Sequence, residues 1–286
     1  MEQVDGARLR DDGYCVVRGA LDAQALATLR DACAGVLETV TPDHRARFRA
    51  QGCVADIAQH PVFADAIAHP VLQRILDDLG LGGQVFCSGS VLSKPAGGPP
   101  LFWHQDWWGW DDPVSRGPRP PQVNMMVYLG PTSVRNGCLR VIPGSHRRRH
   151  ALHDRPITDH LALSAVQDPD HPLYRSWDGE RAVAVEAGDV VVKDARLLHS
   201  AYGNASDAPR TLLSLNYNPR YAQLPSPVQE SIRRIFFGEA VQGSYASPRI
   251  GLLAWPEAQR RKVDHLVPRC APGLAALPMN FTPALD

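Results

Sequence analysis

The middle of the chain, residues 84–220, is a series of short apolar segments separated by turn-forming residues. Strand-like runs cover residues 84–94, 122–129 and 138–142, and proline and glycine crowd the stretch 95–100 after the first of them. Closely spaced strands with Gly/Pro turns are typical of sandwiches and barrels, whereas βαβ units need a helical segment between strands. The sequence therefore predicts a mainly β core with helical decoration.

The β pattern continues after a long polar stretch, residues 147–180, which we expect to be a loop or lid. The dipeptide Asn136-Gly137 favours a tight turn and predicts a hairpin just before the strand at 138–142. Further strands are predicted at residues 181–186, 190–200 and 211–218.

Helical patterns flank this core. Apolar residues recur at helical spacing from residue 21 to 37, with Asp22 as the expected N-cap, and two short helices are expected between Val62 and Leu79. Residues 41–52 are polar and are expected to form an exposed connection. We expect one domain over residues 1–286, made of a helical N-terminal part (1–83), the core (84–220) and a C-terminal extension (221–286).

Composition excludes some classes of partner. Thirty basic and thirty acidic residues cancel, so the overall charge gives no reason to expect nucleic acid or an anionic membrane. No apolar run approaches the ~18 residues that a membrane span needs, and the N-terminus lacks a secretory pattern. We expect a soluble cytoplasmic protein, a monomer or a homodimer, whose six scattered cysteines are buried free thiols.

The stretch Leu101–Trp110 holds four of the six tryptophans and places His104 two residues before Asp106. In an extended segment both side chains point to the same face. An imidazole and a carboxylate suit Fe(II), Mn(II) or Zn(II). The pair by itself favours a surface or hydrogen-bonded structural contact over a metal site.

A third candidate ligand, His199, comes late in an apolar strand, and Arg210 follows eleven residues later. Two histidines and one carboxylate form the facial triad of non-haem Fe(II) oxygenases, which leaves three metal positions open. An arginine at the start of the next strand could grip the carboxylate of an anionic co-substrate.

The order of these segments resembles the phytanoyl-CoA dioxygenase family of Fe(II)/2-oxoglutarate-dependent oxygenases, which includes ectoine hydroxylase and bacterial tailoring hydroxylases. The matching segments are Trp103–Trp107, Asn136–His146, Gly188-Asp189, and Leu198-His199 with Asn204 and Arg210. The resemblance implies a double-stranded β-helix, a jelly-roll with a cupin-like core and the metal at its mouth.

The resemblance also implies roles for individual residues. His104, Asp106 and His199 would bind iron, and Arg210 would pair with the far carboxylate of 2-oxoglutarate. Three further residues lie on strands where contacts to the co-substrate are expected: Gln122, Asn124 and Ser90. Several relatives have a serine two residues after the distal histidine, where this chain has Ala201.

Three tryptophans just past the first two ligands, Trp107, Trp108 and Trp110, could wall the substrate pocket or simply pack in the core. The basic run Arg147–His150 could bind phosphate or coenzyme A, or be a solvated loop. Specificity would be set by the 147–180 loop, the tryptophan stretch and the C-terminal extension.

The activity implied is hydroxylation of an unactivated C–H bond of a small molecule. The enzyme would bind Fe(II), consume 2-oxoglutarate and O₂, and release succinate and CO₂. We expect a role in secondary metabolism. Asp106 argues against halogenation, because the halogenating branch replaces this carboxylate by a small residue. Two alternatives stay open: the same cofactors used for desaturation, epimerisation or ring formation, or a jelly-roll that binds metal without oxygenase activity.

Overall fold

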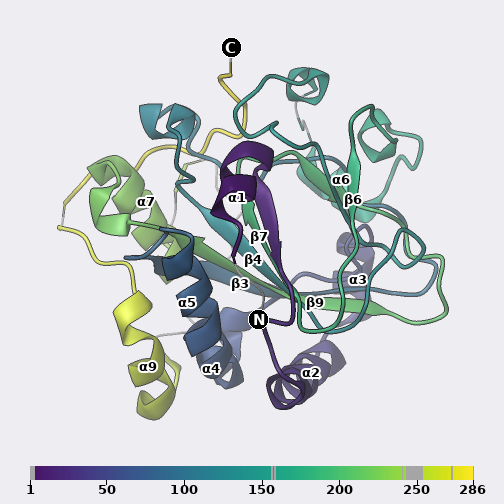
Figure 1. Ribbon diagram of the computed structural model, residues 1–286, viewed down its shortest axis with the longest axis horizontal. Helices are drawn as coiled ribbons and strands as arrows, with labels where there is room; N and C mark the ends of the chain where they lie inside the picture. Colours follow the sequence, from purple (N-terminus) through teal and green to yellow (C-terminus); the bar gives the residue numbers. More distant parts are fainter. Residues whose placement is uncertain are drawn as a thin grey trace.

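Two antiparallel β-sheets that face each other form the centre of the protein (Figure 1). The computed structural model describes residues 4–155, 157, 159–239, 241–242, 254–271 and 273–285. The large sheet has the strand order β1-β7-β4-β9-β3-β2 and the small sheet the order β6-β5-β8. This arrangement confirms the predicted jelly-roll core.

The strands have the following bounds: β1 Tyr14–Val17, β2 Ala55–Asp56, β3 Val85–Lys94, β4 Val123–Tyr128, β5 Leu139–Val141, β6 Arg181–Val183, β7 Val190–Asp194, β8 His199–Ala201 and β9 Arg210–Asn218. The α-helices are α1 Gly6–Asp12, α2 Ala23–Glu38, α3 Pro42–Arg47, α4 Ala64–Ile67, α5 Pro70–Asp78, α6 His160–Ala165, α7 Ser226–Phe237 and α9 Glu257–Val263. Short 3₁₀ turns connect several of them, among them Ala151–Asp154 and Pro172–Tyr174.

The large sheet separates two different environments because side chains alternate between its faces. On β4, Val123, Met125 and Val127 join the core cluster that also contains residues of α2, α4 and α5. The alternate residues Asn124 and Met126 line a cavity between the two sheets. The face away from the helices is therefore the one available for a site.

Helices α2, α4 and α5 lie along the helix-covered face of this sheet, as their labels in Figure 1 show. Asp22 caps α2 by accepting a hydrogen bond from the backbone N–H of Ala25, as predicted, and Pro70 occupies the first position of α5. Residues 41–52, expected to be only a connection, contain α3, which Thr41 caps.

The predicted strand at 190–200 is in fact two strands in different sheets. The chain leaves the large sheet after Asp194 and enters the small sheet at His199. The side chain of Asp194 accepts hydrogen bonds from the backbone N–H and the guanidinium of Arg196, so the two residues close the turn between the sheets. An uninterrupted β pattern could not reveal a turn that consists largely of apolar residues.

The predicted hairpin at Asn136-Gly137 is wrong in its pairing. β4 and β5, which flank this turn, belong to different sheets, and β5 pairs with β6 and β8. Asn136 instead accepts a hydrogen bond from the backbone N–H of Ser133 and closes a local loop. The region 147–180 also departs from a plain loop, because it contains α6 and two 3₁₀ turns.

A tight turn at Gly188-Asp189 comes just before β7 and contacts the N-terminal region. Gly188 has φ +86°, and a β-carbon there would lie 2.7 Å from the carbonyl oxygen of Leu21, so the position requires glycine. Asp189 accepts hydrogen bonds from the backbone of Gly19 and from Arg18. This explains physically why the Gly-Asp pair occurs at this point of the chain.

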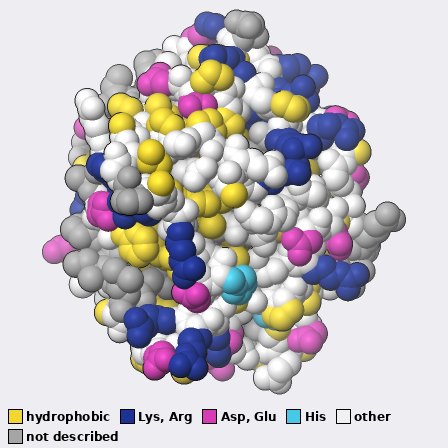
Figure 2. Space-filling model, turned by 90° about the vertical axis from the view of Figure 1, so that its left-hand side faces the viewer, with side chains coloured by type: hydrophobic (Ala, Val, Ile, Leu, Met, Phe, Trp, Pro, Cys, Tyr) yellow, Lys and Arg dark blue, Asp and Glu magenta, His cyan; other side chains and the backbone are white. Residues whose placement is uncertain are grey.

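The surface in Figure 2 carries a group of hydrophobic side chains with Lys and Arg around it. Within the described residues, no helix is long and apolar enough to cross a membrane. None of the six cysteines forms a disulfide, as expected; five are buried, whereas Cys270, also expected to be buried, is partly exposed.

We predict that Asp194→Ala strongly destabilises the fold, because it leaves the fully buried guanidinium of Arg196 without its counter-charge. Removing one partner of a buried ion pair costs about 3–5 kcal/mol. Urea unfolding measures the change, with exposed Asp78→Ala as the control. Equal unfolding free energies for wild type and Asp194→Ala would contradict this role.

Candidate active site

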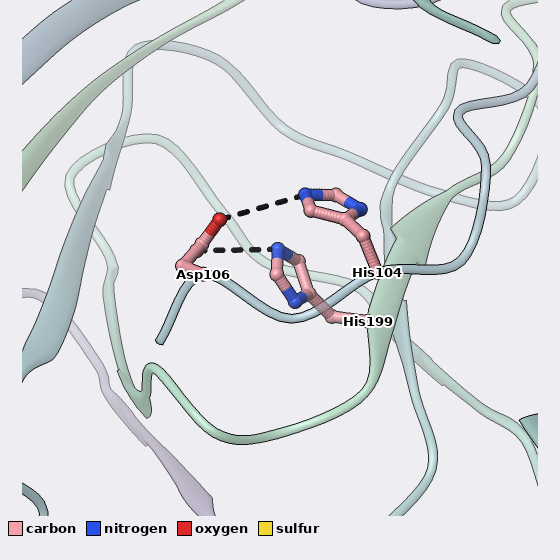
Figure 3. A group of neighbouring side chains, drawn as sticks. All are labelled: His104, Asp106 and His199. Atoms are coloured by element: carbon pink, nitrogen blue, oxygen red, sulfur yellow. Dashed lines mark ion pairs between the residues drawn. The ribbon is translucent and has the colours of Figure 1, made fainter. Parts of the chain in front are cut away.

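His104, Asp106 and His199 come together at one end of the cavity between the sheets (Figure 3). Their potential ligand atoms all lie within 4.8 Å of one another. One carboxylate oxygen of Asp106, Oδ1, is 3.6 Å from His104 Nε2, and the other, Oδ2, is 3.5 Å from His199 Nε2. The two imidazole centroids are 4.1 Å apart. The three side chains therefore face one common point.

Backbone hydrogen bonds hold these residues in place. The N–H of His104 donates to the carbonyl of His199 and the N–H of His199 donates to the carbonyl of His104, each at 3.0 Å. The backbone N–H of Asp106 donates to the carbonyl of Ala195, in the turn between β7 and β8. The site thus depends on the point where the chain passes from the large sheet to the small one.

Both histidines have a defined tautomer. Nδ1 of His104 donates to the carbonyl of Phe102, and Nδ1 of His199 donates to the carbonyl of Leu197, each at 3.0 Å. With the proton on Nδ1, Nε2 keeps its lone pair facing the Asp106 carboxylate. This is the arrangement that a metal-binding imidazole requires.

Burial and neighbouring charges keep these groups in metal-binding protonation states. Burial lowers the pKa of His104, and burial together with the Lys193 ammonium lowers the pKa of His199 well below its usual value. Burial works to raise the pKa of Asp106, but the Lys193 ammonium, which donates a hydrogen bond to Oδ2, opposes it, and the pKa is lowered. Two neutral imidazoles and one carboxylate result.

The cavity between the sheets has a volume of about 170 Å³ and is lined by the three residues above and by Arg210. Arg210 is 8% exposed, and no described residue accepts a hydrogen bond from its Nε. An arginine remains charged when buried, and none of the ion pairs among the described residues involves this guanidinium. The cavity therefore presents a buried positive charge beside the three candidate ligands.

Two of the three further predicted contact residues line this cavity. Ser90 on β3 and Asn124 on β4 lie on its wall, whereas Gln122 is buried just before β4 and does not. Ala201 lines the cavity at the position where several relatives have serine. The hydroxyl of neighbouring Ser200 donates to the carbonyl of Leu101 and accepts a hydrogen bond from Arg140.

Trp107, Trp108 and Trp110, expected either to wall the substrate pocket or to pack in the core, lie away from the two described cavities next to the triad. All three are buried in an apolar cluster with residues of α7, and none lines either cavity near the triad. Trp107 donates a hydrogen bond to the hydroxyl of Ser115. They serve as core, the other reading that the sequence left open.

A second cavity of about 220 Å³ shares His104 and Asp106 with the first. Trp103, His160 and the segment Leu152–Arg155 contribute to its wall, and so does the C-terminal segment Phe281–Pro283. The region 147–180 and the C-terminal extension thus reach the site, as predicted. The basic residues Arg147–Arg149 are exposed and line neither cavity.

The sequence did not indicate a role for two buried lysines, Lys193 and Lys94. Lys193 donates hydrogen bonds to Asp106 Oδ2 at 2.6 Å and to the Asn124 side chain at 2.7 Å. Lys94 lines the cavity and donates to the carbonyls of Ala50 and Pro99. Both lysines lie on strands that the sequence predicts. A lysine buried in a strand is costly unless it is paired, and this was the signal available in the sequence.

Comparison with known proteins agrees with this geometry. The model of the phytanoyl-CoA dioxygenase family matches residues 9–212, which include the triad and Arg210. The chain belongs to the phytanoyl-CoA dioxygenase family. The prediction of an Fe(II)- and 2-oxoglutarate-dependent oxygenase is confirmed with it.

Relatives of the family are similar over most of their length. The chain is 28% identical to the ectoine dioxygenase of Sphingopyxis alaskensis, over 76% of this chain and 75% of that enzyme. It is 25% identical to the multifunctional dioxygenase ausE of Emericella nidulans, over 72% of this chain and 70% of that enzyme.

Solved structures show the same fold. The iron-bound ectoine dioxygenase structure EctD from S. alaskensis is 27% identical, with a TM-score of 0.56 and coverage of 75% of both chains. The carbocyclase SnoK from nogalamycin biosynthesis is 26% identical, with a TM-score of 0.55, over 74% of this chain and 81% of that one.

We predict that Asp106→Ala and His199→Ala each abolish tight Fe(II) binding, because each removes one of the three converging ligands. Asp106→Ala also leaves the buried Lys193 ammonium without its counter-charge and is expected to lower stability, so Asp106→Asn, which can still accept the Lys193 hydrogen bond, is measured beside it. Calorimetry under nitrogen measures Fe(II) affinity, and thermal unfolding checks the fold. Ser206→Ala, on an exposed loop away from the cavity, is the control. A folded Asp106→Ala or His199→Ala variant with wild-type affinity would refute the ligand assignment.

Proposed function

We propose that this protein hydroxylates an unactivated C–H bond of a small molecule, with iron held by His104, Asp106 and His199 and 2-oxoglutarate held by Arg210. The observation that carries this proposal is the pairing, in one cavity, of three converging ligands with a buried arginine whose Nε has no partner among the described residues. The carboxylate of 2-oxoglutarate would bind at Arg210, and the oxidation would take place at the iron held by the three ligands.

The residues fit the two cofactors. Both imidazoles present an unprotonated Nε2, and Asp106 is held as a carboxylate, which is the donor set of a non-haem Fe(II) site. Arg210 offers a planar donor pair that matches a carboxylate. Ser90 and Asn124 line the cavity between these ends and are proposed to contact the co-substrate. Gln122, which lies outside the cavity, is not proposed for this role.

The protein's part in the reaction is to bind, orient and exclude water. Iron and 2-oxoglutarate, when bound, supply the oxidation of the substrate by O₂, with release of succinate and CO₂. Arg210 sets the direction of the co-substrate in the cavity through its charge. Apolar side chains such as Leu92, Met126 and Leu212 line the same cavity and keep water away from the reacting groups.

The second cavity is proposed to hold the substrate. It is lined by His104 and Asp106, as the first cavity is, but most of its other lining residues differ. Its wall mixes apolar and polar side chains, as small-molecule sites do. We place the enzyme in secondary metabolism, where the similar enzyme SnoK acts in nogalamycin biosynthesis.

A different outcome of the same chemistry is a second candidate. Solved structures of similar fold include the carbocyclase SnoK and an epimerase, SnoN, from the same biosynthesis. Ring closure or epimerisation would use the same metal ligands and differ in how the substrate is placed. Product analysis with a panel of small polar metabolites distinguishes a product that gains oxygen from one that only loses or rearranges hydrogen.

We predict succinate formation from 2-oxoglutarate by the purified protein with Fe(II) under air, and none without iron or oxygen. Succinate is measured by mass spectrometry, with Asp106→Ala as the inactive control. A wild-type preparation that binds neither Fe(II) nor 2-oxoglutarate by calorimetry would exclude the oxygenase and favour a jelly-roll without this activity.

We predict that Arg210→Ala mainly raises the 2-oxoglutarate concentration needed for activity. Loss of a charge-assisted bidentate contact costs about 1.5–3 kcal/mol, or roughly a 10- to 100-fold rise in the apparent KM for 2-oxoglutarate. Arg210→Lys keeps the charge and is expected to lose less. Unchanged dependence on 2-oxoglutarate in Arg210→Ala would place the anchor elsewhere.

A further inference from the structure

A ladder of polar side chains, Lys193 and Asn124 buried and Asn216 and Ser88 partly buried, crosses the large sheet and ends at Asp106. Lys193 donates to the Asn124 side chain at 2.7 Å, Asn124 donates to Asn216 at 2.6 Å, and Asn216 donates to Ser88 at 2.8 Å. Neighbouring members are direct partners in the strand register of β7, β4, β9 and β3. The ladder thus lies across four adjacent strands on the cavity side.

The ladder fixes the direction of every group in it. Lys193 can only donate, so the oxygen of Asn124 must face it and the amide N–H₂ of Asn124 must face Asn216. The same reasoning turns Asn216 toward Ser88. Lys193 is 1% exposed and is held from both sides, by Asn124 and by Asp106.

Lys193 contacts only one of the two carboxylate oxygens. Its ammonium lies 2.6 Å from Oδ2 of Asp106, and no described residue donates a hydrogen bond to Oδ1. A carboxylate whose two oxygens both lack a hydrogen-bond donor can bind a metal through one oxygen or through both. The number of oxygens offered decides how many metal positions stay open for co-substrate and oxygen.

We propose that Lys193 is a positioning residue that occupies Oδ2 of Asp106, so that the carboxylate offers the metal Oδ1 alone. This inference rests on the proposed function, since it assumes that the triad binds iron. Lys193 touches Asp106 rather than substrate, and it acts by keeping one more metal position free for 2-oxoglutarate and oxygen. The ladder behind it prevents the ammonium from moving away.

The test counts the waters on bound Mn(II), a stand-in for Fe(II) that needs no turnover. Electron spin echo modulation in D₂O reports exchangeable water on the metal of the folded, loaded protein. We expect Lys193→Met to bind Mn(II) with one water fewer than wild type, because the released Oδ2 also coordinates. Calorimetry on the Mn(II)-loaded variant should show about tenfold weaker 2-oxoglutarate binding.

Matched variants separate positioning from charge and from folding. Lys193→Arg keeps a cation beside Oδ2 and is expected to retain the wild-type water count. Lys94→Met removes the other buried lysine of the cavity, whose ammonium donates to backbone carbonyls, and should also retain the wild-type count. If Lys193→Met does not fold, Lys193→Leu, which also removes the ammonium and leaves little room for water beside Oδ2, replaces it.

Two results would overturn the inference: the wild-type number of waters in a folded, loaded Lys193→Met or Lys193→Leu variant, or the same loss of water in Lys94→Met. Failure of the wild-type protein to bind Mn(II) would instead contradict the proposed function. The two failures are therefore distinct.

Discussion

The pair of backbone hydrogen bonds between His104 and His199 is the interaction on which the site depends. Each residue donates to the other at 3.0 Å, which places two imidazoles from distant parts of the chain 4.1 Å apart. The bond pattern is possible only because β8 lies in the small sheet, with β5 on one side and His104 on the other. The turn that carries the chain into that sheet is closed by Asp194 and Arg196, and its Ala195 carbonyl accepts the N–H of Asp106. One change of sheet thus positions all three candidate ligands.

Strand periodicity gives the large sheet its two functions. Residues facing α2, α4 and α5 are apolar and bury the core, while their neighbours face the cavity and include Arg210, Asn124 and Lys193. Buried polar groups of this kind are costly unless they are paired. Lys193 and Asn124 are paired through the ladder, whereas the Nε of Arg210 is not paired with any described residue. Lys193 is thus proposed to position Asp106, and Arg210 is proposed to bind an anion.

Sequence patterns predicted the β core and the capped helix at Ala23–Glu38, because periodicity is a local property. The convergence of His199 with His104 and Asp106 is not local, and it was predicted from the resemblance to a known family. The patterns failed where pairing is not local. The strand at 190–200 divides between two sheets, and Asn136-Gly137 closes a loop without joining paired strands. The tryptophans past Asp106 pack against α7, which no spacing within the stretch could indicate. Lys193 was missed because its partners lie on a different strand and a different loop.

Specificity and chemistry occupy different parts of the protein. Strand β8 and the segment paired with it supply the three candidate ligands and β9 supplies Arg210, while α6, the 3₁₀ turn at Ala151–Asp154 and the C-terminal segment border the second cavity. The central claim is that one metal ion binds between the two imidazoles and Asp106. Anomalous diffraction at the iron edge, from crystals grown without oxygen in Fe(II) and 2-oxoglutarate, tests it most directly. The account predicts one strong peak about 2.0–2.2 Å from Nε2 of both histidines and from a carboxylate oxygen of Asp106. A peak bound to other residues, or none in crystals shown to contain the folded protein, would contradict it.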